Sequence, residues 1–451
     1  MNNIKNNKKL NAIFFLLGLV GIFSLNVFAA APANDNFADS EQLTGIRLSV
    51  TRSNVEATKE TGEPDHANNI GGKSVWFKWT APFSRMMYVT TNRSEGNFDT
   101  LINVYTGTSL SSLTSAASNH NINGNINRKS LARFIAVAGV TYYIAVDGWG
   151  ASQVPAAEGT FVLDLNPGLQ TEGADYDNDG MTDLAVFRPS NGSWNYIETS
   201  SGITRQKIWG TSGDVPLVGS IYGPGTLGFT VFRPSTNDWA FQPTFGTEAY
   251  FSWGASGDKP VPAQFGGIGN SSFSVYRPST GEWFINNSQN NYFYYHFGTS
   301  EDIPVPGQYS PDDVADIAVF RPSDGNWYFM LRKSGNRNQD VFKGVHFGQM
   351  GDKPIPADFD GDGILDIAVY RPSNSFWYVL RSSDNQFQAF QWGIAEDIPT
   401  TGDYDGDGIF DYAVFRPSVS TWYIRRSSDN SVFSKQFGEM NDIPVTSNYG
   451  K

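Results

Sequence analysis

The 451-residue sequence contains no cysteine. This absence excludes disulfide bonds, thiol catalysis and a lipid-modified cysteine anchor, so the fold must be held together in another way. Charged residues are also scarce, at 17% of the chain, against roughly 25% in an average globular protein. Glycine (46 residues) and aromatic residues (14%) are abundant by contrast. This balance favours turn-rich β-structure over long, charged surface helices.

Positive charge is in deficit as well, because the formal net charge is −13. An acidic protein repels phosphates, which makes a nucleic-acid partner unexpected and suits cation binding instead. Common catalytic signatures are absent too: we find no G-x-S-x-G, no H-E-x-x-H and no cysteine nucleophile. Nothing in the sequence assembles a nucleophile, a base and an orienting group, so we predict a protein that is not an enzyme.

Long apolar runs are missing except for one, at about residues 12–25. Three lysines precede it (Lys5, Lys8 and Lys9), and small residues follow Ala29. This order predicts a secretory signal peptide over residues 1–29. An uncleaved anchor is the alternative, although the run is shorter than the roughly 20 residues that span a bilayer. We therefore expect a secreted protein, periplasmic or extracellular, without a membrane span.

The most informative feature of the sequence is an internal repeat. The motif V-[FY]-R-P-S occurs six times, at intervals of 44 to 50 residues, with its arginine at Arg188, Arg233, Arg277, Arg321, Arg371 and Arg416. A tryptophan follows each arginine by six residues: Trp194, Trp239, Trp283, Trp327, Trp377 and Trp422. Each copy is also associated with an Asp-x-Pro motif: Asp214, Asp258, Asp302, Asp352, Asp397 and Asp442.

Within one copy, four short β-prone runs alternate with turn residues: "DIAVYRPS", "FWYVLRSS", "NQFQAFQWG" and "DIPTTGDYD". Four strands per unit at this period indicate a β-propeller of about six blades over residues 174–451. The first copy lacks a preceding Asp-x-Pro run, and the last copy ends with one. The C-terminal run can therefore complete the first blade and close the ring, although an open β-solenoid of the same repeats is an alternative.

Three of the repeats carry the acidic spacing D-x-D-x-D-G-x-x-D. Its residues are Asp175, Asp177, Asp179 and Asp183; Asp358, Asp360, Asp362 and Asp366; and Asp403, Asp405, Asp407 and Asp411. Alternate carboxylates in a tight loop, with a backbone carbonyl from Met181, Ile364 or Ile409, supply the oxygen ligands that Ca²⁺ requires. The loops are not EF-hands, because position twelve is an apolar strand residue rather than a glutamate.

Two other interpretations of these aspartates remain open. They could be polar turn formers, although clustering carboxylates without a counter-ion is costly. They could also supply a catalytic pair, although a repeated loop offers the same geometry three times and catalysis needs two unequal acids. The remaining repeats have lost most of the acids, so calcium would be needed in only some blades. Structural Ca²⁺ would substitute for the missing disulfides.

The repeated arginines and tryptophans also allow two interpretations. The arginines could form a ring that binds an anion, or each could pair with the aspartate of an Asp-x-Pro motif. The tryptophans could form the core between blades or a platform for sugars. Residues present in every copy usually belong to the packing of the repeat. A ligand site would more readily use residues that differ between blades, such as the aromatic run 292–296.

These repeats resemble the FG-GAP and VCBS-type calcium-loop repeats of integrin α-subunits and many bacterial secreted proteins. The resemblance rests on "DYDNDGMTDLAVFRPS", "DFDGDGILDIAVYRPS" and "DYDGDGIFDYAVFRPS". It implies a calcium-stiffened propeller that serves adhesion or ligand binding.

Residues 32–166 lack the repeat and contain longer runs with alternating polarity, which predict an antiparallel β-sandwich joined to the propeller by a linker at 167–173. The phrases "SVWFKWTAP", "FDTLINVYTG" and "GVTYYIAVDGWG" are similar to the bacterial pre-peptidase C-terminal (PPC) family, whose domains accompany secreted hydrolases and surface proteins. That resemblance implies a possible calcium site near Glu60, Glu63, Asp99 and Asp147, for which solvated turn acids are the alternative.

Three functions are compatible with this sequence. The first is a secreted, non-catalytic adhesion or binding protein that recognises a polysaccharide or another cell-surface macromolecule. The second is a polysaccharide lyase or hydrolase built on the propeller. The third is a structural envelope protein without a discrete ligand.

Overall fold

The computed structural model describes residues 30–451 apart from short gaps at 46–47, 83–84, 92–93, 95–97, 122–127, 153, 168–173, 178–180, 200, 220–227, 244–247, 266–270, 287–291, 311–313, 333–339, 447 and 450–451. The predicted signal peptide and Asp179 lie outside the described residues. Regular structure in the described ranges consists of β-strands and short 3-10 helices. None of the helices described is long and apolar enough to cross a membrane.

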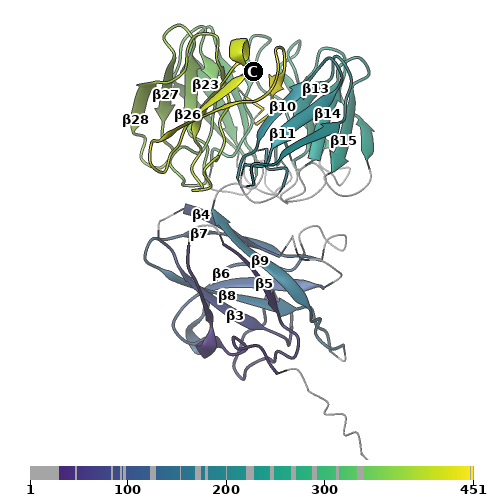
Figure 1. Ribbon diagram of the computed structural model, residues 1–451, viewed down its shortest axis with the longest axis vertical. Coiled ribbons are helices and arrows are strands. Elements are labelled where there is room, and N and C mark those ends of the chain that lie inside the picture. The colour runs from purple at the N-terminus through teal and green to yellow at the C-terminus, as the bar shows by residue number, and fades with distance from the viewer. Residues whose placement is uncertain are drawn as a thin grey trace, which may run out of the picture. The chain divides into compact units, whose positions relative to one another are not determined.

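The N-terminal domain contains two sheets (Figure 1). The five-stranded sheet has the order β1 (Glu41–Leu43), β3 (Val75–Thr80), β8 (Thr141–Gly148), β5 (Thr100–Thr106) and β6 (Thr114–Asn119). The four-stranded sheet has the order β2 (Leu48–Ser53), β9 (Thr160–Pro167), β4 (Arg85–Thr90) and β7 (Leu131–Ala136). One hydrophobic core includes residues of both, such as Phe77 of β3 and Phe161 of β9. The apolar faces of the two sheets therefore pack on each other.

Six four-stranded sheets follow, each an antiparallel meander. Blade 1 contains β10 (Leu184–Arg188), β11 (Ser193–Ile197), β12 (Thr204–Ile208) and the C-terminal β33 (Ile443–Pro444). Blade 2 contains β13 (Val215–Leu217), β14 (Gly228–Arg233), β15 (Asp238–Pro243) and β16 (Ala249–Ser252). Blade 3 contains β17 (Lys259–Pro260), β18 (Phe273–Arg277), β19 (Glu282–Asn286) and β20 (Tyr292–His296).

The remaining three blades have the same plan. Blade 4 contains β21 (Ile303–Pro304), β22 (Ile317–Arg321), β23 (Asn326–Leu331) and β24 (Val341–His346). Blade 5 contains β25 (Lys353–Pro354), β26 (Ile367–Arg371), β27 (Phe376–Leu380) and β28 (Phe387–Gln391). Blade 6 contains β29 (Ile398–Pro399), β30 (Tyr412–Arg416), β31 (Thr421–Arg425) and β32 (Val432–Gln436). In each blade the strand at the outer edge of the sheet is the most exposed. In β32, for example, every residue is exposed.

The six sheets form a closed ring. A separate hydrophobic cluster joins each consecutive pair of blades, and one of them joins blade 6 to blade 1 through residues such as Phe415 and Val186. In addition, β33 pairs with β10, with Ile443 opposite Phe187. We call this β33–β10 pairing the closure seam. The fold is therefore an all-β propeller, and the open solenoid is excluded.

The repeated arginine of each blade pairs with the aspartate of an Asp-x-Pro motif. Arg321 is typical: its Nε donates to Oδ1 of Asp302 at 2.8 Å and its Nη2 donates to Oδ2 at 3.0 Å. The other five arginines make the same two-pronged contact, and in blade 1 the contact joins Arg188 to Asp442 across the closure seam. Forked guanidinium–carboxylate pairs fix orientation as well as charge. The arginines thus lock the blades and do not form an anion-binding ring.

The repeated tryptophans belong to the core. All six are fully buried. Each indole N–H donates to the carbonyl of an aromatic residue that directly precedes a glycine after the outer strand, as Trp327 does to Phe347 of the Phe347-Gly348 pair at 2.8 Å. A buried indole needs such a partner for its one donor. These side chains therefore cannot serve as an exposed sugar platform.

Candidate metal sites

In blades 5 and 6 the acidic loop lies between the first and second strands of the blade, and in blade 1 it directly precedes β10. In blade 5 the loop is closed at its base by a bridge between Ala357 and Asp366, and blade 6 repeats this bridge between Gly402 and Asp411. In the loops of blades 5 and 6 two glycines have positive φ, for example Gly361 at 80° and Gly363 at 85°. Side chains are disfavoured in that backbone conformation, which explains the alternation of aspartate and glycine. The loop can therefore turn tightly enough to gather its carboxylates.

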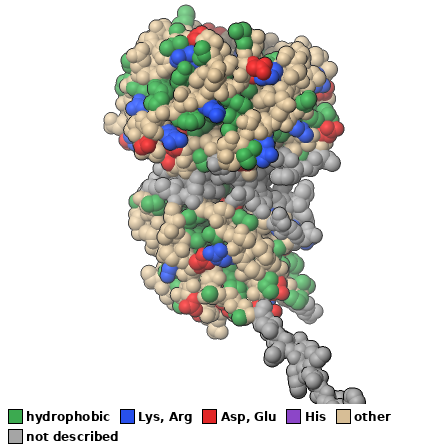
Figure 2. Space-filling view, in the orientation of Figure 1, with side chains coloured by type: hydrophobic (Ala, Val, Ile, Leu, Met, Phe, Trp, Pro, Cys, Tyr) green, Lys and Arg blue, Asp and Glu red, His purple; other side chains and the backbone are tan. Residues whose placement is uncertain are grey.

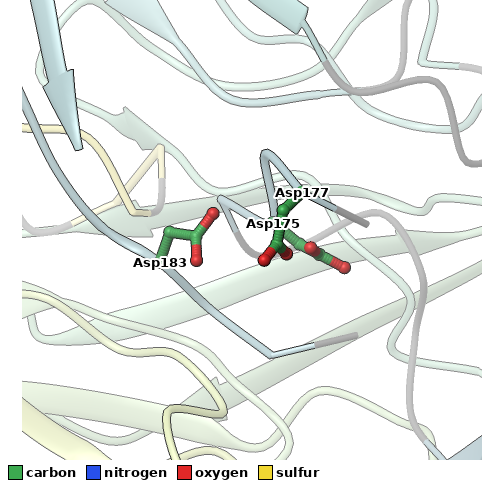
Figure 3. Close-up of side chains that lie close together, drawn as sticks. All are labelled: Asp175, Asp177 and Asp183. Carbon is green, nitrogen blue, oxygen red and sulfur yellow. The ribbon is translucent and has the colours of Figure 1, made fainter. Parts of the chain in front are cut away.

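Each loop brings three aspartates together, with one carboxylate oxygen from each lying within 4.8 Å of the others. The three groups are Asp175, Asp177 and Asp183; Asp358, Asp360 and Asp366; and Asp403, Asp405 and Asp411. Figure 3 shows the first group, with Asp175 and Asp177 on the loop and Asp183 just before β10. Nine of the twelve aspartates in the predicted spacing thus converge.

Backbone amides hold the first and last aspartates of the groups in blades 5 and 6, and Asp183, the last aspartate of the group in blade 1. In blade 5, Asp358 accepts hydrogen bonds from the N–H groups of Gly361 at 2.5 Å and Gly363 at 2.9 Å. Asp366 accepts from Phe359 at 2.8 Å and from Ser382 at 2.6 Å. Blade 6 reproduces the four contacts with Asp403 and Asp411. The carboxylates are consequently fixed in position by the protein itself.

The third aspartate of the spacing lies outside these groups. Asp362 accepts a hydrogen bond from the N–H of Ile364 at 2.8 Å and another from the Ser382 hydroxyl at 2.9 Å. Asp407 accepts from the N–H of Ile409 at 2.7 Å. These contacts stabilise the turn. The third aspartates stay predicted ligands: Asp179, Asp362 and Asp407. The backbone carbonyls of Met181, Ile364 and Ile409 also stay predicted ligands.

Burial and mutual repulsion dominate the electrostatics of these loops. Burial raises the pKa of Asp358 well above its usual range, and the nearby carboxylate of Asp366 adds to the effect. Burial is also the main reason why the pKa of Asp366 rises to about 7 and that of Asp411 to about 8. A bound cation would favour the charged form of carboxylates in such an environment. The donor set, which consists of oxygens only, suits a hard divalent ion.

Serine side chains that the sequence analysis did not single out complete the sites. The hydroxyl of Ser383 donates to Asp360 at 2.6 Å, and that of Ser428 donates to Asp405 at 2.6 Å. Both serines stand twelve residues after the arginine of their repeat, beyond the third strand of the blade. Their common position in the repeat was the signal that could have identified them.

The loops are also joined to one another around the ring. The N–H of Leu365 donates to the carbonyl of Gln308 in the preceding blade at 2.8 Å. The N–H of Phe410 donates to the backbone carbonyl of Asp358 at 2.9 Å. The N–H of Thr182 in blade 1 donates to the backbone carbonyl of Asp403 in blade 6 at 2.7 Å. The three acidic loops therefore occupy consecutive blades, 5, 6 and 1, next to the closure seam. A cation in any one of them would also stiffen a contact between blades.

Blade 4 shows what happens where the acidic spacing is lost. Asp316 keeps the structural role of the last aspartate and accepts from the N–H groups of Tyr309 at 3.0 Å and Arg332 at 2.6 Å. The Arg332 guanidinium donates to the carbonyl of Ala315 at 3.3 Å and lies 5.0 Å from the centre of the Phe293 ring. In blades 5 and 6 a serine occupies this position. The last aspartate thus supports the loop whether or not the other acids are present.

The acidic residues of the N-terminal domain are engaged in other ways. Asp147 is buried and accepts hydrogen bonds from the backbone of Gly72, Lys73 and Gly148, the last two at 2.7 Å. Glu63 contacts His66 at 2.8 Å, and both are buried. Among the residues that the structure describes, neither acid belongs to a cluster of three potential metal ligands. Asp147 and Glu63 are therefore internal hydrogen-bonding groups rather than solvated turn acids.

Comparisons with known proteins add little. Neither a protein-family model nor a curated protein matches the chain. Solved structures with distant similarity include a streptogramin B lyase (10% identity, TM-score 0.39, covering 61% of this chain and 85% of that one) and AztD from Citrobacter koseri (7% identity, TM-score 0.36, covering 77% and 97%). A virginiamycin B lyase from Staphylococcus aureus is similar at 8% identity and a TM-score of 0.37, covering 59% and 84%. Values this low support no conclusion about activity.

Proposed function

We propose that the chain is a secreted, calcium-stabilised binding protein of a bacterial periplasm or cell exterior. The observation that carries this proposal is the placement of three converging acid groups in consecutive loops beside the closure seam. The proposal includes the FG-GAP or VCBS character of the repeats and a PPC-type β-sandwich for the two N-terminal sheets. It also includes cleavage of the signal peptide.

The first role of Ca²⁺ in this proposal is to hold the ring closed. The closure seam consists of two residue pairs between β33 and β10, supported by the cluster between blades 6 and 1. A ring built from one chain has one such joint, and opening it frees both ends. Cations bound by Asp175, Asp177 and Asp183, and by the groups of blades 5 and 6, would neutralise the buried carboxylates on both sides of the joint. The protein residues supply the oxygens, and the bound ion supplies the missing positive charge.

The second part of the proposal is that the propeller binds rather than transforms its ligand. The acid groups are identical copies, whereas acid–base catalysis needs carboxylates in unequal environments. A polysaccharide or another surface macromolecule is the ligand class that we favour for such a secreted propeller.

The test is a co-sedimentation assay of the purified protein with a panel of polysaccharides and cell-wall fractions, in calcium and in EDTA. Bound protein and newly released reducing ends are measured in the same samples. We expect retention that weakens in EDTA, without release of reducing ends. Released sugar ends would replace the binding function with a catalytic one. Absence of retention on every fraction would contradict the ligand class.

A further inference from the structure

The outer strands of blades 2 and 3 expose an unusual number of tyrosines. Tyr250 of β16 is 62% exposed, and Tyr292 and Tyr294 of β20 are 71% and 67% exposed. Between these two, Phe293 points the other way and is buried against blade 4. The strand thus places one aromatic residue in the core and two in solvent. Figure 2 shows hydrophobic side chains exposed on the surface of the propeller.

These tyrosines do not stand alone, because each outer strand meets an indole of the preceding blade. The Tyr250 ring lies 5.8 Å from that of Trp209, and the Tyr292 ring lies 6.4 Å from that of Trp253. Both indoles are anchored: Trp209 Nε1 donates to the carbonyl of Ala240 at 3.4 Å, and Trp253 Nε1 donates to that of Phe284 at 3.3 Å. We call Trp209, Tyr250, Trp253, Tyr292 and Tyr294 the aromatic shelf. It offers two aromatic pairs at successive blade boundaries.

The charge around the shelf restricts its partner. Strands β16 (AYFS) and β20 (YFYYH) contain no lysine, arginine, aspartate or glutamate, and neither does β28 (FQAFQ) of blade 5, whereas the outer strands of blades 1, 4 and 6 carry lysine or arginine. A strongly charged ligand would find no counter-charge on these strands. Tyrosine rings combine an apolar face with a hydroxyl that hydrogen-bonds in water. An uncharged polymer with apolar faces and many hydroxyls fits this chemistry best.

We propose that the aromatic shelf binds a neutral polysaccharide by stacking of its sugar rings on Tyr292, Tyr294 and Tyr250. This inference rests on the proposed binding function and assigns its site and the charge class of its ligand. Two aromatic pairs, one per blade boundary, provide repeated contact points that suit a polymer better than a single sugar. Because the indoles and Phe293 are already ordered by the core, little side-chain freedom is lost on binding.

The experiment measures retardation of the purified chain in native gels that contain glucomannan, xyloglucan or the charged polymer polygalacturonate. The test variant is Tyr292→Ala/Tyr294→Ala, and Tyr292→Phe/Tyr294→Phe keeps the rings while removing the hydroxyls. The matched control is Phe387→Ala, which truncates an aromatic side chain on β28 that is 59% exposed. Because all these side chains face solvent, thermal melts should stay unchanged and would identify any variant that misfolds.

We expect the wild-type chain to bind a neutral polymer and the alanine pair to lose at least about tenfold in affinity, since each ring lost removes an aromatic contact. The phenylalanine pair and Phe387→Ala should bind nearly as the wild type does. Retention of affinity in the alanine pair would overturn the shelf while leaving the binding function intact. Binding of the charged polymer alone would also overturn it. No binding to any polysaccharide would refute the carbohydrate function and the shelf together.

Discussion

Removal of calcium should destabilise the propeller by an amount that can be worked out from the three acid groups. Each group gathers three carboxylates, so we expect three ions per chain. At about 1 mM Ca²⁺ and a Kd of about 0.1 mM, within the range of extracellular calcium modules, each site adds about 1.4 kcal/mol to the free energy of unfolding. Three independent sites add about 4 kcal/mol. In a domain of this size that corresponds to a fall of about 8 °C in Tm on addition of EDTA.

The variant Asp360→Asn/Asp405→Asn tests whether this shift arises in the loops. Both substitutions keep the side-chain shape and an oxygen that can accept the serine hydroxyl, but each removes one of three charges from its group. We expect the EDTA shift to shrink to about 3 °C, the share of the one intact site. Asp429→Asn is the matched control, because Asp429 is an exposed acid of blade 6 outside the acid groups.

Differential scanning calorimetry in calcium and in EDTA measures the shift, and equilibrium dialysis counts the ions. A wild-type Tm that does not respond to EDTA would refute the reasoning. So would an equal loss of the shift in the Asp429→Asn control, because the effect would then reflect net charge rather than the loops.

Three further predictions concern the ring itself. Arg321→Ala leaves the buried carboxylate of Asp302 without its partner and should cost about 3–5 kcal/mol in urea unfolding, whereas a cost below 1 kcal/mol would contradict the locking role. Trp377→Ala removes a fully buried indole and should also cost about 3–5 kcal/mol, measured in the same way; a neutral effect would show that the core can collapse around the gap. Ending the chain after Phe437 removes β33 and exposes the edge of β10, so size-exclusion chromatography should show oligomers; a monomer with an unchanged Tm would argue against closure by β33.

Much of the propeller could be predicted because its signals are local and repeated. The arginine, the tryptophan and the Asp-x-Pro motif keep a constant spacing, so each copy indicates the same four strands. The unmatched Asp-x-Pro run at the C-terminus even predicted closure, which the pairing of Ile443 with Phe187 confirms. The alternation of aspartate and glycine in the sequence likewise predicts a tight loop, and nine of the aspartates converge as expected.

Other properties of the site depend on contacts between residues far apart in the chain. The spacing predicts the same metal-binding role for Asp362 and Asp366. In the structure Asp362 accepts a hydrogen bond within the turn while Asp366 belongs to the acid group, because the loop directs their side chains differently. Ser383 approaches Asp360 only because the second and third strands of the meander return to the loop. No local pattern marks either result.

The sequence by itself determined the β-class, the repeat and the acidic spacing, since all of these follow from short-range patterns that recur six or three times. It left two partners open for the repeated arginines, and the structure decided for the Asp-x-Pro aspartates. Only the tertiary structure decided that the acidic loops of blades 5, 6 and 1 are neighbours beside the closure seam, with Thr182 bonded to Asp403. It also decided that Tyr292 faces solvent and Asp147 does not. The physical reason is that burial and neighbour identity in a ring are set by how the blades pack and close, which couples residues more than two hundred positions apart.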